Sequence, residues 1–404
     1  MKKFLLLIGV VLLFTGCPPN WKNAAKIHIA GGRFELAKQN CLIGTKVVPA
    51  DYEAYTLLAQ CELGLQNSAA ASVAFREGIK IDSVKTLAWI MKDAQNKDLY
   101  WQTFYGAAVA NVTGEKDNEA LADLAIAKII DPANVNAYVL EGLIYTRLGK
   151  KESANAAYAK AIEIDPESPE PYFRIGTSYF EKKSYDTALI YLDKSLTKYT
   201  VGYENIKKTI FANIEFNKDI ARQIYTLWSA KKDEELDQLV KKVLGFDVGL
   251  EGQRRNIERF IKSSNGLAGA YYYIGMTYLN QKKDTLALNN LNAALDLSPE
   301  DLDALYFSGE VLIDLKNWTE AKNRFERVTV LKKDDVVAWF YVGVCYMQLK
   351  DYRKAASVYE DEVLKYDPKN LDAYTNLAIC YREMGDTKKA MEYLQKKEQI
   401  IKGK

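Results

Sequence analysis

A spacing of residue types that returns every 34 residues is the feature that most limits what this chain can fold into. Its clearest copy, residues 135–168, places aromatic, small and proline positions at fixed offsets: Tyr138, Gly142, Tyr145, Ala154, Tyr158, Ala161 and Pro166. The small residues let two antiparallel helices approach closely, the aromatic rings fill the space that is left, and the proline ends the second helix. The pattern therefore predicts a stack of helical hairpins.

The same frame recurs over most of the chain, in units near 18–51, 52–85, 101–134, 135–168, 169–202, 268–301, 302–335, 336–370 and 371–404. The unit 336–370 is one residue longer than the others. In its order of aromatic, small and proline positions the chain resembles the tetratricopeptide repeat (TPR) family. The resemblance implies an all-α fold, a TPR α-solenoid in which about nine recognisable hairpins form a right-handed superhelix.

Two segments break the frame. Residues 86–100 contain the stretch LAWIMKDA, which predicts an extension of a helix. Residues 203–267 have no strong repeat, but they are charged and contain no proline, and 219–229 and 233–243 are spaced like a degenerate helix pair. We interpret 203–267 as an atypical helical connector between an N-terminal block, 17–202, and a C-terminal block, 268–404. An independent small domain is the alternative.

The sequence predicts a targeting signal at the N-terminus. Lys2 and Lys3 precede an apolar run over 4–14, which is too short to span a bilayer as a helix. Thr15 and Gly16 then precede Cys17, a pattern that resembles a bacterial lipobox. The resemblance implies a signal peptide over 1–16, cleavage before Cys17 and acylation of that residue, with palmitate among the chains. An ordinary signal peptide or an uncleaved anchor is the alternative. The expected location is the bacterial cell envelope, at the outer membrane or the outer face of the inner membrane.

The charge and motif content predicts neither nucleic-acid binding nor catalysis. Loss of residues 1–16 would leave 55 − 2 = 53 basic against 53 acidic side chains, which gives no field to attract nucleic acid. A single histidine in 404 residues argues against most zinc sites and histidine-based triads. The chain has no phosphate-binding glycine loop, no HExxH and no GxSxG motif. We therefore expect no enzyme activity, no metal and no cofactor.

The TPR resemblance also implies a partner site. In that family the first helix of each unit lines a concave groove, chiefly through its second, fifth, ninth and twelfth positions. Carried onto this chain, these positions give apolar and aromatic groove candidates: Tyr105, Val109, Leu143, Phe173, Phe180, Tyr272, Met276, Tyr306, Phe340, Val344, Met347 and Ile379. Packing between helices is an equally ordinary role for the aromatic ones. The ninth position is usually polar in the family, so its apolar residues here predict a covered groove.

These features together predict a membrane-anchored scaffold that binds a protein or peptide partner in the groove. The expected ligand is an amphipathic helix or an extended apolar peptide, or the chain's own segment 203–267. A site for a small apolar ligand or glycan is a competing function, and self-association through the last unit is another. The oligomeric state, the partner and the membrane stay open.

Four cysteines and one glutamate are expected in the core. Cys41, Cys61, Cys345 and Cys380 fall at packing positions of their units, where a free thiol behaves as a small hydrophobe. A Cys345–Cys380 disulfide is disfavoured, because equivalent positions of stacked units lie about 8–10 Å apart, whereas a Cys41–Cys61 bond stays open. Glu141 takes a position that is apolar in other units, so a structural ion pair is expected for it.

Overall fold

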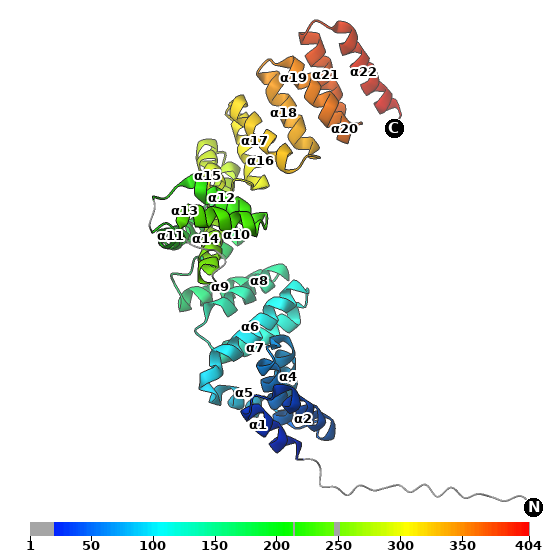
Figure 1. Cartoon of the computed structure of the whole chain (residues 1–404). Coiled ribbons are helices and arrows are strands. Elements are labelled where there is room, and N and C mark those ends of the chain that lie inside the picture. The colour runs from blue at the N-terminus through cyan, green and yellow to red at the C-terminus, as the bar shows by residue number, and fades with distance from the viewer. Residues whose placement is uncertain (1–19, 213–214, 246–250, 404) are drawn as a thin grey trace, which may run out of the picture. The chain divides into compact units, whose positions relative to one another are not determined.

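A computed structural model describes residues 20–212, 215–245 and 251–403. Every secondary-structure element in these residues is a helix (Figure 1). The chain divides into two compact units, 1–165 and 166–404. The predicted signal peptide, 1–16, and Cys17 lie outside the described residues. Across the described ranges, none of the helices has the length and apolarity that a membrane span requires.

From residue 20 onward, the first unit consists of four helix pairs, one short additional helix and a 3₁₀ turn. Its elements follow one another as α1 (Trp21–Ala30), α2 (Phe34–Val47), α3 (Tyr52–Gly64), α4 (Ser68–Ile81), α5 (Ser83–Lys92), a 3₁₀ turn η1 (Ala94–Asn96), α6 (Lys97–Thr113), α7 (Asp117–Ile130), α8 (Val135–Arg147) and α9 (Lys151–Ile164). The pairs α1–α2, α3–α4, α6–α7 and α8–α9 match the predicted hairpins of this part of the chain.

The second unit continues the pairs, with two much longer helices. Its elements are α10 (Pro169–Glu181), α11 (Tyr185–Ile210), α12 (Lys218–Ser229), α13 (Asp233–Leu244), α14 (Glu251–Asn280), α15 (Asp284–Leu297), α16 (Leu302–Asp314), α17 (Trp318–Leu331), α18 (Val336–Gln348), α19 (Tyr352–Val358), a π turn η2 (Tyr359–Val363), α20 (Leu364–Tyr366), α21 (Leu371–Glu383) and α22 (Thr387–Lys402). The predicted block boundaries at 202 and 268 fall inside α11 and α14, so the connector is continuous with the hairpins on either side of it.

One turn geometry joins the two helices of every pair. A single residue with positive φ sits in each turn, and the next residue donates its N–H to the carbonyl five positions back, as Lys150 does to Tyr145 (2.8 Å). Within uninterrupted runs of units these residues recur every 34 residues, or 35 across the longer unit: Gly32, Gln66, Glu115, Gly149, Lys183, Lys282, Lys316, Lys350 and Gly385. Lys231, between α12 and α13, has the same geometry. The helix pair predicted within 203–267 is therefore present, and it turns like the regular hairpins.

Glycine–aromatic contacts bring the two helices of a pair together. A Cβ added to Gly142 of α8 would overlap the ring of Tyr158 in α9, and one added to Gly343 of α18 would lie 2.6 Å from Cζ of Tyr359. Both rings are almost completely buried. Since real Cβ atoms do not come so close to other atoms, only glycine fits opposite these rings. The role predicted for the small and aromatic positions is confirmed here.

The extra residue of the unit 336–370 is taken up by a π turn. Residues Tyr359–Val363 form η2 between α19 and α20, where the regular units have continuous α-helix. A π turn holds one residue more than an α turn, and such turns occur mostly as single insertions in α-helices. Tyr359 stays fully buried at the start of η2 and accepts a hydrogen bond from the amide of Asn376 in the next unit (2.9 Å). The insertion leaves the contact between units in place.

The segment 86–100 differs from its prediction. It does not extend a helix: Asp82 ends α4 and caps α5, its carboxylate accepting the N–H of Lys85 (2.9 Å). The ring of Trp89 on α5 then lies 6.0 Å from that of Phe75 and 6.0 Å from that of Tyr100. The prediction was wrong because Asp82 and Ser83 form a helix-start signal, which a reading based on apolar residues alone overlooks.

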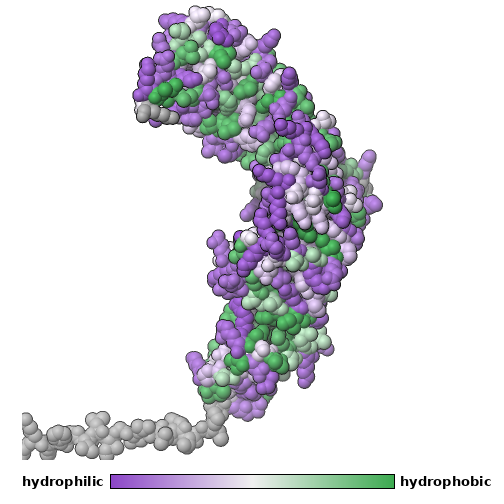
Figure 2. Space-filling view, turned by 180° about the vertical axis from the view of Figure 1, so that it is seen from behind, coloured by the Kyte–Doolittle hydropathy of each residue, from purple (hydrophilic) through white to green (hydrophobic). Residues whose placement is uncertain are grey.

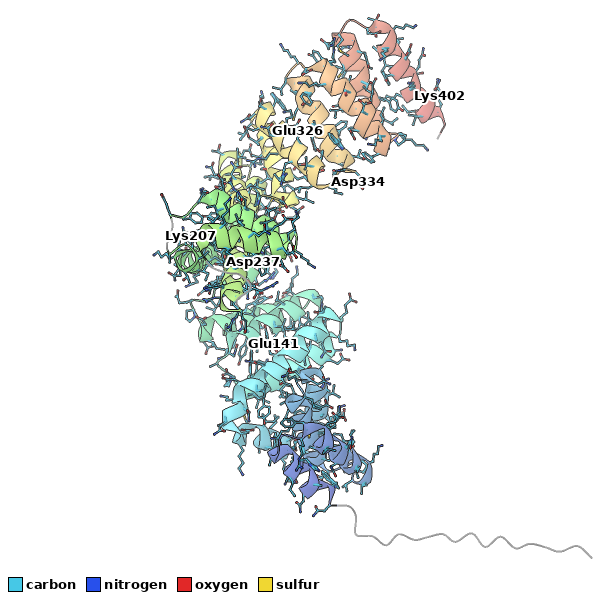
Figure 3. The ribbon with its side chains drawn as sticks, in the orientation of Figure 1. Glu141, Lys207, Asp237, Glu326, Asp334 and Lys402 are labelled. Atoms are coloured by element: carbon cyan, nitrogen blue, oxygen red, sulfur yellow. The ribbon has the colours of Figure 1, made fainter. Side chains whose placement is uncertain are left out.

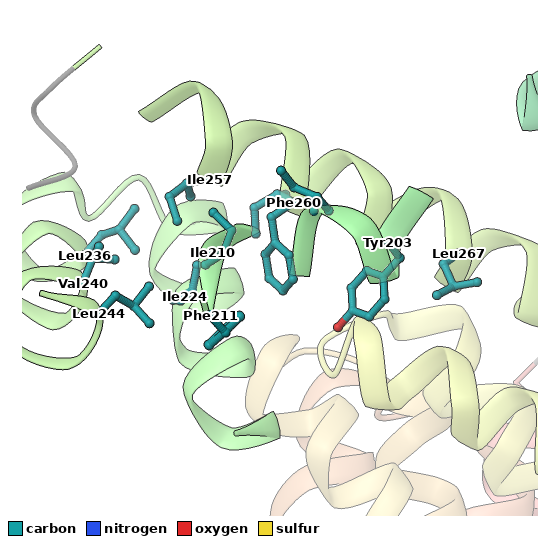
Figure 4. Close-up of a cluster of buried hydrophobic side chains, with 12 residues drawn as sticks. Tyr203, Ile210, Phe211, Ile224, Leu236, Val240, Leu244, Ile257, Phe260 and Leu267 are labelled. Carbon is teal, nitrogen blue, oxygen red and sulfur yellow. The ribbon is translucent and has the colours of Figure 1, made fainter. Parts of the chain in front are cut away.

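The connector has its own hydrophobic core (Figure 4). Ile224 of α12 and Leu236 and Val240 of α13 pack with Ile210 at the end of α11 and with Ile257 near the start of α14. None of the twelve groove candidates belongs to this cluster. The described part of the connector therefore fills its own core and not the predicted groove.

The predicted core roles of the cysteines and of Glu141 are confirmed. Cys41, Cys61, Cys345 and Cys380 are free and completely buried, and the sulfurs of Cys41 and Cys61 lie 3.9 Å apart without a bond. Glu141, labelled in Figure 3, lies on α8. Its carboxylate accepts a hydrogen bond from the ammonium of Lys128 on α7, at 2.6 Å.

Candidate functional site

The twelve groove candidates all lie on first helices of the hairpins. They belong to α6 and α8 in the first unit, and to α10, α14, α16, α18 and α21 in the second. Val109 is 40% exposed, Met276 is 9% exposed, and the other ten are half-buried. We call the surface formed by these helices the first-helix face of each unit. Apolar and hydrophilic side chains are interspersed on the side of the molecule that Figure 2 presents.

In the second unit the aromatic candidates also hold neighbouring hairpins together. The rings of Phe173 and Phe180 on α10 each lie 5.6 Å from the ring of Tyr273 on α14. The ring of Tyr272 lies 6.3 Å from that of Phe307 on α16. Edge-on and tilted rings at such distances attract one another beyond their apolar burial. These side chains therefore pack between helices with one part and remain accessible with another.

The first unit has a smaller version of this arrangement. Tyr105 stacks on Trp101 of the same helix, with ring centres 4.7 Å apart, and burial raises the pKa of its hydroxyl. Tyr105 and Leu143 pack against one core cluster that links α6, α7 and α8. Val109, one turn beyond Tyr105, is left exposed. The structure thus brings these three predicted residues to neighbouring first helices.

The sequence interpretation missed three aromatic residues on the same face. Tyr273, Phe307 and Tyr341 each occupy the sixth position of their units and are half-buried beside the predicted ones. The ring of Tyr341 stacks on that of Phe325, with ring centres 4.7 Å apart. An aromatic residue at the same position of three successive units could have indicated this role from the sequence. The sixth position was not considered because it is not among the groove positions carried over from the family.

A glutamate on the same face was also missed. Glu310 takes the ninth position of its unit, where five other units have an apolar residue, and it is half-buried. Burial raises the pKa of its carboxyl group and the nearby Asp314 raises it further, while a hydrogen bond from Tyr341 acts in the opposite direction.

Three carboxylates share one stripe of α16. Asp303, Glu310 and Asp314 are spaced by seven and then four residues, which puts them on one side of an α-helix. None of the three forms an ion pair with a lysine or arginine among the described residues. Asp303 also raises the pKa of Tyr272, though less than burial of that ring does. The stripe therefore carries uncompensated negative charge next to aromatic rings.

The first helices of the second unit are acidic as a group. Over α10, residues 268–280 of α14, α16, α18 and α21 there are seven Asp and Glu side chains against two Arg and no Lys. The segment 268–280 and helix α18 have no charged side chain at all. The charge is concentrated on α16, between these two uncharged and aromatic-rich helices.

A pocket lies apart from this face, where the connector meets α15. It has a volume of about 330 Å³ and is lined by α11, α12, α14 and α15, with Tyr203 and Phe260 among its walls. Asp296 at its rim binds the ammonium of Lys218 (3.0 Å) and the guanidinium of Arg222 (2.6 Å). The lining thus combines charged side chains with aromatic and apolar ones. No cluster of His, Cys, Asp and Glu suited to a metal ion occurs in the part of the chain that the structure describes.

Family models match four stretches that coincide with these hairpins. A model of the TPR repeat matches residues 142–183, and models of the tetratricopeptide repeat match 272–322, 309–363 and 346–396. The chain contains tetratricopeptide repeats. The matched stretches cover α8–α10 and α14–α22 in whole or in part, so the first-helix face of the second unit is a surface of TPR hairpins.

The chain is similar to several solved structures. YrrB, a TPR protein with an unusual peptide-binding site, is 23% identical, with 60% of this chain and 92% of YrrB covered at a TM-score of 0.41. PilF of Pseudomonas aeruginosa is 12% identical over 69% and 96% of the two chains, with a TM-score of 0.46. PilW, a widely conserved type IV pilus biogenesis factor, is 14% identical over 67% and 94%, with a TM-score of 0.42. No curated protein matches the chain.

Proposed function

We propose that this protein is an interaction scaffold of the bacterial cell envelope, which binds a helical or extended polypeptide segment on its first-helix faces. The observation that carries the proposal is the row of aromatic and apolar side chains that the first helices carry within each unit, ten of them half-buried and Val109 exposed. A partner that covers this row gains free energy at roughly 25 cal/mol per Å² of apolar surface removed from water. The connector, which packs on its own core, leaves the row available.

Site-specific crosslinking distinguishes this face from the opposite side of a hairpin. A photoreactive benzoylphenylalanine at Val109, on α6, is expected to give one discrete crosslinked product in cell envelopes. The matched control is Ile129, on the second helix α7 of the same hairpin, which is 50% exposed against 40% for Val109. Mass spectrometry identifies the product. Equal yields at the two positions, or a product only at Ile129, would contradict the proposal.

The membrane anchor is part of the proposal and rests on the sequence around Cys17. Acyl chains bind a bilayer with about 0.8 kcal/mol per buried CH₂ group, and two or more chains give stable anchoring. Replacing Cys17 with serine is expected to move the protein from the membrane fraction to the soluble fraction of lysed cells. Metabolic labelling with an alkyne fatty acid should mark the unaltered protein and not the variant. A Cys17→Ser variant that still sediments with membranes would show that the anchor is elsewhere.

A further inference from the structure

The acidic stripe of α16 lies within the face that we assign to a partner, and its surroundings limit the partner's chemistry. Asp303, Glu310 and Asp314 have no cation beside them, and Glu310 is half-buried. Like charges on one stripe repel one another, and water and salt screen a half-buried charge less than an exposed one. A bound cation would relieve both costs.

The neighbouring rings favour the same kind of ligand. The π-faces of tyrosine and phenylalanine attract ammonium and guanidinium groups within about 6 Å. Elsewhere the chain uses this contact internally, for example with Lys389 placed 4.3 Å from the ring centre of Tyr381. Among the described residues, however, no lysine or arginine lies over Tyr272, Phe307 or Tyr341, which flank the stripe. These rings and the carboxylates are available to the same cationic groups.

The length of the stripe selects a polypeptide over a small cation. Eleven residues separate Asp303 from Asp314, which corresponds to about 16 Å along an α-helix. One small cation cannot neutralise carboxylates over that distance. A helix or strand with several basic side chains on one edge can do so while its apolar edge covers the rings.

We propose that the first-helix face of the second unit, at α14, α16 and α18, binds a polypeptide segment that combines apolar residues with lysine or arginine. This rests on the proposed scaffold function and specifies its partner. The carboxylates of α16 bind the basic groups, and Tyr272, Phe307 and Tyr341 contact both these groups and the apolar residues. Complementary charge of this kind gives specificity and a rate of association that depends on salt.

Three matched peptides test the proposal with the full chain. Each is a 20-residue amphipathic helix with the same leucine pattern. The polar positions are lysine in the first peptide, glutamine in the second and glutamate in the third. Fluorescence anisotropy is expected to show at least about tenfold tighter binding of the lysine peptide than of the glutamine peptide, with the glutamate peptide weakest. Raising the salt concentration should weaken only the lysine peptide strongly.

Charge-removing variants then locate the site. The double variant Glu310→Gln, Asp314→Asn is expected to lose about tenfold in affinity for the lysine peptide. The control, Glu320→Gln with Glu392→Gln, removes the same charge from the second helices α17 and α22 and should change the affinity less than about twofold. Circular dichroism confirms that both variants are folded.

The outcomes separate this proposal from the scaffold function. If the glutamine peptide binds as tightly as the lysine peptide, or if the two double variants behave alike, the charge assignment is overturned while a scaffold remains supported by crosslinking at Val109. If no peptide binds, the charge assignment is again overturned, and the Val109 and Ile129 crosslinks decide on the scaffold independently.

Discussion

Replacing Arg76 with alanine is expected to lower the free energy of unfolding of the first unit by about 1–2 kcal/mol at pH 7, since a buried carboxyl group that loses its partner takes up a proton. The guanidinium of Arg76 on α4 donates to Oδ2 of Asp123 on α7 (2.9 Å), and the amide of Asn111 on α6 donates to the same oxygen (2.9 Å). Asp123 is completely buried, and its Oδ1 has no hydrogen-bond partner among the described residues. Without Arg76, the buried carboxyl group would lose the only ion-pair partner that it has among the described residues.

The pH dependence of this loss identifies its cause. Burial raises the pKa of Asp123 to about 6 in the folded chain, against about 3.9 when unfolded, although Arg76 and Asn111 act to lower it. The folded state therefore binds the proton more tightly, and the contribution of Asp123 to stability is largest below about pH 4 and declines as the pH rises to about 6. Removing Arg76 raises this pKa further. At pH 5 Asp123 is then mostly protonated with or without Arg76, so Arg76→Ala should lower the free energy of unfolding less at pH 5 than at pH 7.

Hydrogen exchange of peptides from α4, α6 and α7, measured over a urea series, reports the stability of this region. A second substitution provides the control: Asp123→Asn in the Arg76→Ala background should recover most of the loss, because no charge is then left buried. A double variant that is as unstable as Arg76→Ala alone would show that the guanidinium acts through packing and not through Asp123.

One substitution made at two glycines of the first unit should have opposite effects. Gly142→Ala is expected to destabilise by about 1–3 kcal/mol, because its Cβ overlaps the buried ring of Tyr158 and the surrounding core must shift. Gly106→Ala on α6 should instead stabilise by about 0.5–1 kcal/mol, since its Cβ meets no atom within 4 Å and alanine favours helix over glycine.

Urea unfolding of the two variants, followed by circular dichroism, measures both effects against the unaltered protein. Because the added group is the same methyl in each case, the difference between the variants reports the space around the residue. If Gly142→Ala were as stable as Gly106→Ala, the contact between α8 and α9 would be looser than Tyr158 and Gly142 indicate.

Much of the fold was predictable because each hairpin depends on local spacing. The offset from Gly142 to Tyr158 predicts a helix contact directly, and the same offset from Gly343 is shared by Tyr359. The pair of Arg76 and Asp123 was not predictable in this way. In the sequence, the segment 86–100, which interrupts the repeat frame, lies between these two residues, and α5 begins just before it at the cap residue Asp82. The fixed offsets of the repeat therefore do not relate Arg76 to Asp123.

The candidate site was predicted in part. The fifth, ninth and twelfth positions place residues such as Tyr272 and Phe340 on first helices, as the structure confirms. Tyr273 and Phe307 were missed because the sixth position is not among the positions carried over from the family, and Glu310 was missed because only apolar residues at the ninth position were taken as candidates. Whether a ring between helices stays partly accessible depends on its neighbours in space, such as Phe180 beside Tyr273, and not on its own position in the repeat.

The π turn at Tyr359–Val363 has a consequence for how such an array changes over time. Lys350 and Gly385, which occupy equivalent turns, are 35 residues apart instead of 34, yet Asn376 still reaches Tyr359. A single-codon insertion in a second helix can thus be confined to one widened turn, without shifting the modules downstream. Repeat length in this architecture can drift one residue at a time while the interface between modules is inherited intact.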